Sequence, residues 1–115
     1  MLFLCYPKCT TCQKARKFLC DNSISFEERN IKENNPSAKE LTEWLKMSCL
    51  SVRKLFNTSG ILYREMGLSK KLDNMSQDEC IELLASDGML VKRPILVTES
   101  KVLVGFKPAE WEKLI

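Results

Sequence analysis

The chain has 115 residues, of which 44% are hydrophobic and 29% are charged, and its formal net charge is +3. This length and composition predict one globular domain over residues 1–115 and exclude a disordered or fibrous chain. The small positive charge does not by itself indicate nucleic-acid binding, and we expect none. No apolar run reaches the roughly 20 residues of a membrane span, and no signal peptide is evident, so we expect a cytoplasmic protein that does not enter a membrane.

The sequence has no histidine and six cysteines. The lack of histidine excludes Ser-His-Asp and Cys-His nucleophile systems, histidine zinc sites and imidazole acid–base catalysis. Because no secretory signal accompanies them, the cysteines indicate thiol chemistry or simple burial rather than a disulfide framework.

A strand, a helix and a second strand are expected at the start of the chain. Residues 2–6 form a short, continuously apolar run that is typical of a buried strand. A helical pattern follows from residue 10 or 11 to residue 19, and residues 25–31 form a second β-rich run. These elements make a βαβ unit, in which parallel strands are joined by a right-handed crossover.

The middle of the chain, about residues 36–90, is expected to be a helical insert. Shorter helical pieces are predicted over residues 52–56 and 61–65, and the last helix of the insert should stop near Gly88. The two longer helices begin at sequences with the spacing of a capping box, Ser37 with Glu40 and Ser76 with Glu79.

The end of the chain predicts a hairpin and a short helix. Residues 95–98 and 102–104 are the two β-rich runs, and Pro108 suits the first position of a helix that runs to Leu114. The element order is therefore β-α-β, a helical insert, then β-β-α. It predicts an α/β fold of the thioredoxin/glutaredoxin-like type, whose two halves share one mixed four-stranded sheet.

The motif Cys9-Thr10-Thr11-Cys12 lies where the first strand gives way to the helix. A thiol attacks only as the thiolate, and the unpaired N–H groups and dipole of a helix N-terminus would stabilise that anion at Cys9, with Lys8 adding positive charge. Cys12, one helical turn on, is placed to resolve a mixed disulfide at Cys9. Half of a structural zinc site, or two core cysteines that are close by coincidence, are the alternatives.

The remaining cysteines are less informative. Cys5 falls in a strand, and Cys20 and Cys80 fall in amphipathic helices, so we expect all three to be small buried hydrophobic residues. Cys49 lies in an irregular stretch, and its environment is left open.

A second candidate feature is Arg93-Pro94, just before the hairpin. In a thioredoxin-like fold this loop faces the active cysteine and its proline is cis. Arg93 would then point its guanidinium toward Cys9, where it could bind an oxyanion or lower the thiol pKa. The alternative is an ordinary proline at a strand entrance beside a surface arginine with no role.

Four segments together carry a family resemblance: Tyr6–Ala15, Ser51–Leu55, Arg93–Ile95 and Gly105–Pro108. They resemble the arsenate reductase (ArsC) family and the related Spx-like redox regulators, in order and spacing, over essentially the whole chain. The resemblance implies a thioredoxin-like fold with a helical insert. It also implies that Cys9 is the nucleophile and that Arg93 binds an oxyanion beside a cis Pro94.

The resemblance further implies how an oxyanion would be held. The backbone N–H groups of Thr10, Thr11 and Cys12 would bind it together with Arg93. The second cysteine of the loop is shared with Spx-like proteins, whereas glutathione-dependent arsenate reductases have a single cysteine there.

Those reductases also surround the oxyanion with three arginines, and two of these positions differ here. Asn57 and Lys107 stand at them; Lys107 keeps the charge and Asn57 does not. Arg53, one helical turn before Asn57, is a candidate replacement.

We therefore expect a thiol-dependent oxidoreductase of the ArsC family whose Cys9 thiolate attacks a small oxyanion or a disulfide. No bound cofactor or metal is expected, and glutathione, glutaredoxin or thioredoxin would be the external reductant. The alternative is an Spx-like redox-sensing transcriptional regulator that binds RNA polymerase. A third is a thioredoxin-like scaffold with inactive cysteines. Arg93→Ala should abolish arsenate chemistry but leave sensing largely intact.

Overall fold

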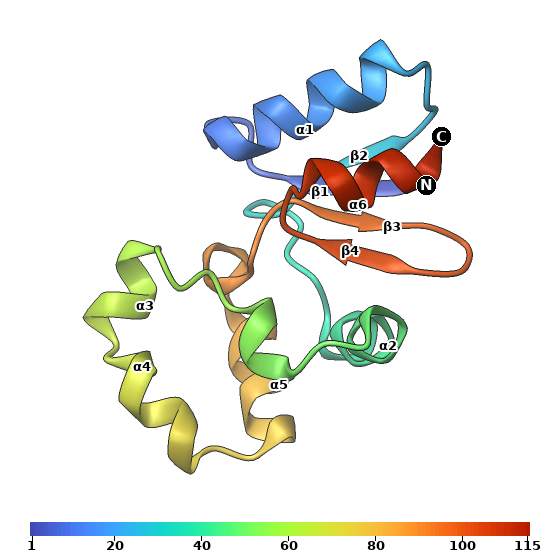
Figure 1. The fold of residues 1–115 in the computed structure, drawn as a ribbon. Helices are drawn as coiled ribbons and strands as arrows, with labels where there is room; N and C mark the ends of the chain where they lie inside the picture. Colours follow the sequence, from blue (N-terminus) through green and yellow to red (C-terminus); the bar gives the residue numbers. More distant parts are fainter.

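A computed structural model describes residues 1–115 and shows a mixed α/β fold (Figure 1). The predicted order of β-α-β, helical insert and β-β-α is confirmed. The strands are β1 (Leu2–Cys5), β2 (Glu27–Asn30), β3 (Ile95–Val97) and β4 (Val102–Val104). The helices are α1 (Thr10–Asp21), α2 (Ala38–Ser48), α3 (Ile61–Glu65), α4 (Leu68–Lys71), α5 (Gln77–Ser86) and α6 (Pro108–Trp111).

The four strands form one mixed sheet in the order β2-β1-β3-β4. β1 runs parallel to β2, with Leu2 opposite Glu27 and Cys5 opposite Asn30. β3 is antiparallel to both β1 and β4. The predicted mixed four-stranded sheet of the thioredoxin-like fold is thereby confirmed, and β2 and β4 are its two edges.

Helices cover both faces of the sheet, with α1 and α6 on one face and α2 and α5 on the other (Figure 1). Side chains alternate along each strand and so feed two separate cores. On β1, Phe3 packs with Trp111 beneath α1 and α6, whereas Leu4 packs with the residues of the insert. α1 turns Ala15 and Leu19 onto the same side as Phe3, and both are fully buried there.

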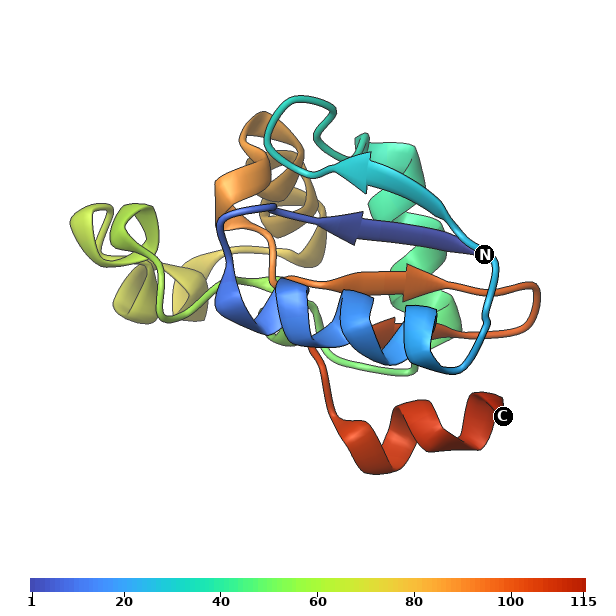
Figure 2. The same cartoon turned by 90° about the horizontal axis from the view of Figure 1, so that it is seen from above.

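The insert begins and ends with the two longer helices that its capping boxes predict. In each, the serine side chain accepts the N–H of the glutamate three residues on, and that glutamate accepts the serine N–H. Between them, α3 and α4 project beyond the sheet (Figure 2). α4 was not predicted from the sequence; it begins after a glycine in the left-handed region, Gly67 at φ +64°.

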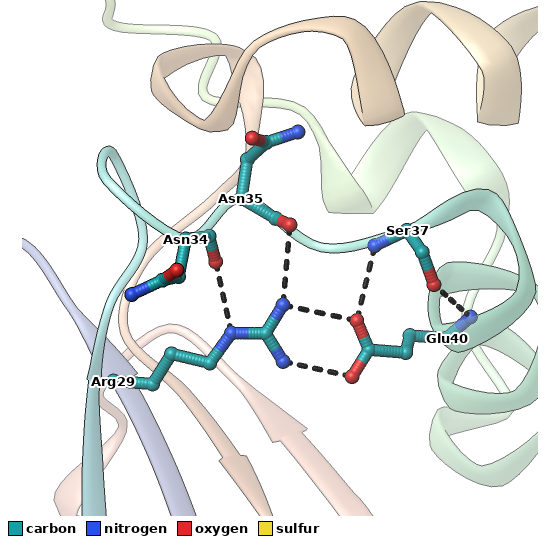
Figure 3. A network of polar contacts seen from close by, with 5 residues as sticks. All are labelled: Arg29, Asn34, Asn35, Ser37 and Glu40. Atoms are coloured by element: carbon teal, nitrogen blue, oxygen red, sulfur yellow. Dashed lines mark hydrogen bonds and ion pairs between the residues drawn. The ribbon is translucent and has the colours of Figure 1, made fainter.

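Arg29 of β2 ties the sheet to the insert. Its guanidinium donates to both carboxylate oxygens of Glu40 at 2.7 and 3.0 Å, and to the carbonyl oxygens of Asn34 and Asn35 (Figure 3). Glu40 is also the glutamate of the Ser37 capping box. One side chain therefore fixes the end of β2, the connecting loop and the first turn of α2.

Several element boundaries differ from the prediction. The second strand is shorter than residues 25–31, because β1 has only four residues with which it can pair. The predicted helical piece over residues 52–56 is a 3₁₀ turn, Val52–Leu55. α5 ends at Ser86, close to the predicted stop near Gly88, and a further 3₁₀ turn, Gly88–Leu90, follows it.

One prediction about the cysteines is wrong. Cys20 is exposed, although Cys5 and Cys80 are buried as expected. Cys20 follows the buried Leu19 and so lies roughly 100° around the helix from it, outside the stripe that faces the sheet. Cys49, which the pattern left open, is exposed and ends α2 in the left-handed conformation.

None of the helices has the length and apolarity that a bilayer crossing requires.

Candidate active site

Cys9 occupies the N-cap position of α1. Its backbone is extended, at φ −82° and ψ 123°, and its carbonyl accepts the first helical hydrogen bond, from Gln13 N–H at 3.0 Å. A tight turn after β1 fixes this position, since the Cys9 N–H donates to the carbonyl of Tyr6 at 2.9 Å. The half-buried thiol therefore sits beside the unpaired N–H groups of the first helical turn, as predicted for an activated cysteine.

The surroundings of Cys9 favour the thiolate. Burial by itself would raise its pKa, but hydrogen bonds from the Cys12 backbone N–H, the Arg93 side chain and the Cys12 thiol, with the Arg93 charge, together lower it below the usual value. The net direction is the one a nucleophilic thiol requires.

Cys12 has the opposite environment. Its side chain is 2% exposed, and burial raises its pKa to about 12, with the nearby Cys9 thiolate adding to the rise. Its sulfur accepts the Tyr6 N–H at 3.4 Å. The two thiols are thus close together, one tending to the thiolate and the other held as the thiol. Cys12 also belongs to the core beneath α1, so it packs as a hydrophobic residue as well.

Arg93 reaches the site from the loop before β3. Its peptide bond to Pro94 is cis, as expected for this loop. The guanidinium carbon lies 5.2 Å from the centre of the Tyr6 ring, and one terminal nitrogen lies 4.0 Å from the sulfur of Met89. The stacking orients the guanidinium toward Cys9, and its buried Nε has no hydrogen-bond partner. Since the terminal nitrogens make no hydrogen bond to a protein oxygen, they are the donors left for a ligand in the cavity.

Cys9 opens into a cavity of about 670 Å³. Three cationic side chains line it, and no carboxylate does, so the cavity favours an anion. The apolar part of its wall includes Ile61 and Leu62, which come from the start of α3. The cations are Lys92, Arg93 and Lys107.

The structure brings some of the predicted substrate-binding residues to this cavity and not others. Thr11, Asn57 and Lys107 line it with Cys9 and Arg93. The side chains of Lys8, Thr10 and Pro94 do not; Thr10 is nevertheless the first residue of α1, next to Cys9.

Arg53 is not brought to the cavity. Its guanidinium donates to Asp73 at 2.9 Å and to the carbonyl of Ser69 at 3.2 Å. The expectation assumed a continuous helix from Arg53 to Asn57, but the 3₁₀ turn ends at Leu55, and Phe56 is extended and bridges to Val91. The two side chains therefore do not share a helix face.

Two polar residues of the cavity, Lys92 and Ser59, were not predicted as site residues from the sequence. Lys92 directly precedes Arg93, and its N–H donates to the carbonyl of Leu55 at 2.7 Å. Ser59 lies in the turn before α3. Lys92 had a signal in the sequence, its position beside the arginine, whereas Ser59 is brought in only by the fold.

The profile of one protein family, described as the ArsC family, matches residues 4–114. The chain belongs to the ArsC family. The Spx-like part of the resemblance is supported too, since the global transcriptional regulator Spx of Enterococcus faecalis is 29% identical over 95% of this chain and 81% of its own length. The regulatory protein MgsR of Bacillus subtilis is 31% identical over 99% of this chain and 89% of its own length. Together with the close pair of thiols, membership supports a thiol-oxidoreductase type of protein.

Two solved structures extend the likeness within the ArsC family. An ArsC family related protein from Bacteroides fragilis is 56% identical, with a TM-score of 0.97 over 99% of this chain and 96% of its own. A protein described as a possible arsenate reductase, from Streptococcus mutans, is 44% identical, with a TM-score of 0.90 over 99% of this chain and 97% of its own. Both share the thioredoxin-like fold described above.

Proposed function

We propose that this ArsC-family protein is a thiol oxidoreductase in which Cys9 is the nucleophile and Cys12 the resolving thiol. The observation that carries the proposal is the position of Cys9, at a helix N-terminus and within hydrogen-bonding reach of Arg93, in a cavity lined by cations and by no carboxylate. An anionic substrate, or the thiolate that leaves a disulfide, is stabilised there.

With a disulfide substrate, the Cys9 thiolate attacks one sulfur and the S–S bond breaks. The departing sulfur takes the electron pair and leaves as a thiolate, and Cys9 is joined to the other half in a mixed disulfide. The cations of the cavity, Arg93 foremost, stabilise the thiolate that leaves.

Cys12 then attacks the sulfur of Cys9. The negative charge on Cys9 is one cause of the raised Cys12 pKa, and that charge disappears once Cys9 is in a mixed disulfide. Cys12 therefore loses its proton more readily at the stage at which a thiolate is needed. The bound half is released as a thiolate, and a Cys9–Cys12 disulfide remains. Glutathione, glutaredoxin or thioredoxin would supply the two electrons that reduce it.

Arsenate is the oxyanion that we propose for the same site. Sulfur of Cys9 displaces an oxygen of arsenate, which leaves as water, and forms an S–As bond. A thiolate from Cys12 or glutathione next attacks Cys9; the S–As electron pair stays on arsenic, which is reduced from As(V) to As(III), while the two thiols are oxidised to a disulfide. Arg93, the N–H groups of Thr10, Thr11 and Cys12, and the side chains of Asn57 and Lys107 are the proposed ligands of the oxyanion, with Lys8 adding charge.

The likeness to the global transcriptional regulator Spx of Enterococcus faecalis favours a second candidate, a transcriptional regulator that senses redox state through the same two thiols. In that function, closing a Cys9–Cys12 disulfide would alter the surface around the cavity and the affinity for a transcription partner such as RNA polymerase. The same two thiols serve both functions, but only the enzyme needs the oxyanion ligands.

A single-turnover trap tests the enzyme. The fully reduced protein is mixed with arsenate and glutathione and quenched with an alkylating agent, and its cysteine-containing peptides are compared by mass with a sample lacking arsenate. We expect arsenate to drive Cys9 into a disulfide with Cys12 or glutathione. A Cys12→Ser variant should accumulate the glutathione adduct alone.

The contrary result is equally informative. If Cys9 remains fully alkylated in the presence of arsenate while diamide closes the Cys9–Cys12 disulfide, arsenate is not a substrate and a disulfide-reducing or sensing function stands. If arsenate does oxidise Cys9, an Arg93→Ala variant separates arsenate chemistry from simple disulfide formation, because it should lose arsenate-driven oxidation but still respond to diamide.

A further inference from the structure

The Cys9 cavity is larger than a bare oxyanion requires. Its volume of about 670 Å³ corresponds to roughly twenty water molecules, whereas arsenate is a single tetrahedral group. Part of its wall is apolar, with Leu62 and the 69% exposed Ile61 at the start of α3, and Phe106 just before α6. Apolar walls with a few polar groups are typical of sites for organic ligands. The cavity therefore fits a substrate whose reacting group is attached to an organic body.

A second cationic hollow adjoins this cavity. It has a volume of about 270 Å³, and Lys92 and Lys107 line both spaces. Lys54 lines the hollow but not the cavity. No carboxylate lines either space, and none of these three lysines has an ion-pair partner. A positively charged surface thus extends from Cys9, in the cavity, to Lys54 in the hollow.

Backbone pairing holds the two segments that carry these lysines beside each other. The Lys92 N–H donates to the carbonyl of Leu55 at 2.7 Å, next to the bridge between Phe56 and Val91. Phe56 and Val91 are fully buried, and because side chains alternate along an extended segment, Lys92 turns away from the core that they enter. Lys54 lies in the 3₁₀ turn that ends at Leu55. The backbones of the two lysines are therefore fixed relative to each other.

The charges lie too far apart along this surface to serve one small anion. Arg93 is within hydrogen-bonding reach of Cys9, whereas Lys54 belongs to the hollow alone. A ligand that uses both ends must carry a negative group remote from the atom that Cys9 attacks. The apolar wall of the cavity is available to the part of the ligand in between.

The remote group that the hollow matches is a phosphate. A phosphate monoester carries close to two negative charges at neutral pH, so several cations without a carboxylate suit it better than they suit a single carboxylate. Lys54, Lys92 and Lys107 supply these charges. Arg53 also lines the hollow, but its ion pair with Asp73 already uses its charge.

We infer that the substrate of the dithiol is a small disulfide of a thiol that carries a phosphate group at its far end. The disulfide lies at Cys9, the organic arm lies against the apolar wall, and the phosphate is held among Lys54, Lys92 and Lys107. The reaction rests on the proposed function, whereas the binding of the phosphorylated arm does not.

One turnover needs only the reduced protein and the disulfide. The Cys9 thiolate attacks one sulfur and the S–S bond breaks; one phosphorylated thiol leaves with the electron pair and takes a proton from water. Cys12 loses its proton to the solvent, attacks Cys9 and releases the second phosphorylated thiol in the same way. The substrate has then gained two electrons, and Cys9 and Cys12 have lost them in forming their disulfide.

A matched pair of probes isolates the contribution of the phosphate. The disulfide of 4′-phosphopantetheine and that of pantetheine have the same sulfur atoms and the same organic arm, and they differ in the remote phosphate. Each is mixed in excess with fully reduced protein, and alkylation followed by peptide mass analysis gives the rate constant for Cys9 oxidation. We expect the phosphorylated disulfide to react about tenfold faster or more below saturation, because the lysines bind its far end.

Lys54→Gln tests the hollow, and Lys32→Gln is its control. Lys32 follows β2, at the sheet edge opposite β4, and its loss changes the net charge equally. The ratio of the two rate constants is compared, because a change in Cys9 itself would affect both disulfides alike. We expect this ratio to fall about fivefold or more in Lys54→Gln and to stay within about twofold in Lys32→Gln.

Three results would overturn the inference. The two disulfides could react at the same rate, or the two substitutions could have equal effects, so that net charge alone accounts for the preference. Glutathione disulfide, whose remote anions are carboxylates, could react faster than the phosphorylated disulfide.

A Cys9→Ser protein separates this inference from the proposed function, because it keeps the lysines and loses the nucleophile. Reduced 4′-phosphopantetheine should shift the backbone amide signals of Lys54 and Lys92 in ¹⁵N NMR spectra, and should bind about tenfold or more tightly than pantetheine or inorganic phosphate. Such binding without oxidation of wild-type Cys9 would refute the oxidoreductase alone. Oxidation of Cys9 with no preference for the phosphorylated arm in either experiment would refute the phosphate site alone.

Discussion

Cys9 and Cys12 lie one helical turn apart, yet their thiols have opposite acidities. Cys9, at the N-cap, receives hydrogen bonds from the Cys12 N–H and from Arg93, and its pKa is lowered. Cys12 points into the core, and burial raises its pKa to about 12. The difference arises from helix geometry, since the N-cap faces the cavity while the third helical residue faces the sheet. One helix start can thus supply both an attacking thiolate and a protonated partner.

The contribution of Arg93 can be measured through the reactivity of Cys9. The guanidinium stabilises the thiolate, so Arg93→Ala should raise the Cys9 pKa and move the pH at which iodoacetamide alkylation is half-maximal upward. Below that pH the variant should react more slowly than the wild type, and in strong alkali the two rates should converge. Peptide mapping separates Cys9 from the exposed Cys20 and Cys49.

The control for that experiment is Arg53→Ala, which removes the same kind of side chain from a position outside the cavity. Its alkylation profile should match the wild type. A normal profile in Arg93→Ala as well would mean that the helix N-terminus alone activates Cys9.

At the scale of elements, Arg29 and Glu40 join β2 to α2. The pair is bidentate and partly shielded, with side chains 22% and 34% exposed, and the guanidinium also holds two loop carbonyls. Arg29→Ala should lower the free energy of unfolding by about 1–2 kcal/mol after allowance for solvent screening. Urea titrations followed by tryptophan fluorescence would measure it. Lys17→Ala breaks a solvent-exposed pair with Asp21 and should leave the unfolding curve essentially unchanged, because water screens that pair.

The effect of Arg29 should depend on pH in a defined direction. The hydrogen bond from Arg29 lowers the pKa of Glu40 below its usual value, despite the opposing effect of burial. A carboxyl group whose pKa is lowered by folding stabilises the fold above its unfolded pKa, and that stabilisation is lost as the pH falls through the folded pKa. The difference between wild type and Arg29→Ala should therefore be full above about pH 5 and shrink in stronger acid. A constant difference across this range would assign the role of Arg29 to its carbonyl contacts instead.

Most elements could be predicted from the sequence because they depend on local patterns. Both capping boxes start helices where predicted, and Pro108 is the first residue of α6. Two of the errors have non-local causes. The length of β2 is limited by its partner β1, and Arg53 misses the cavity because the chain becomes extended at Phe56 to pair with Val91. Neither constraint is visible within a window of neighbouring residues.

The residues of the candidate site likewise fall into those that a local motif or a family resemblance predicts and those that only the tertiary fold brings to the cavity. Cys9, Cys12 and Arg93 could be found because a motif or a family resemblance marks them. Ser59 could not, since it is carried to the cavity by the turn before α3, in a part of the insert whose path depends on tertiary packing.

At the scale of the whole molecule, the insert returns to the sheet after α5, and Gly88 lies where the returning chain packs against the residues that follow β2. A Cβ atom on Gly88 would lie 1.8 Å from the carbonyl oxygen of Ile31, the fully buried residue that follows β2. No rotamer relieves a clash with backbone, so one of the two segments must move. The segment that leaves Gly88 continues through Lys92 to Arg93, which connects this contact to the active site.

Gly88→Ala should therefore lower the free energy of unfolding by about 3 kcal/mol and also raise the Cys9 pKa, because the displaced loop carries Arg93 away from the thiol. Gly67→Ala is the matched control. It lies in open space at φ +64°, so it should lose only about 1 kcal/mol, from backbone strain, with the alkylation profile of Cys9 unchanged. Urea unfolding and iodoacetamide kinetics on the same two proteins measure both effects. Equal losses of stability, or a Gly88→Ala protein with wild-type Cys9 reactivity, would show that the sheet and the site tolerate a shift of the insert.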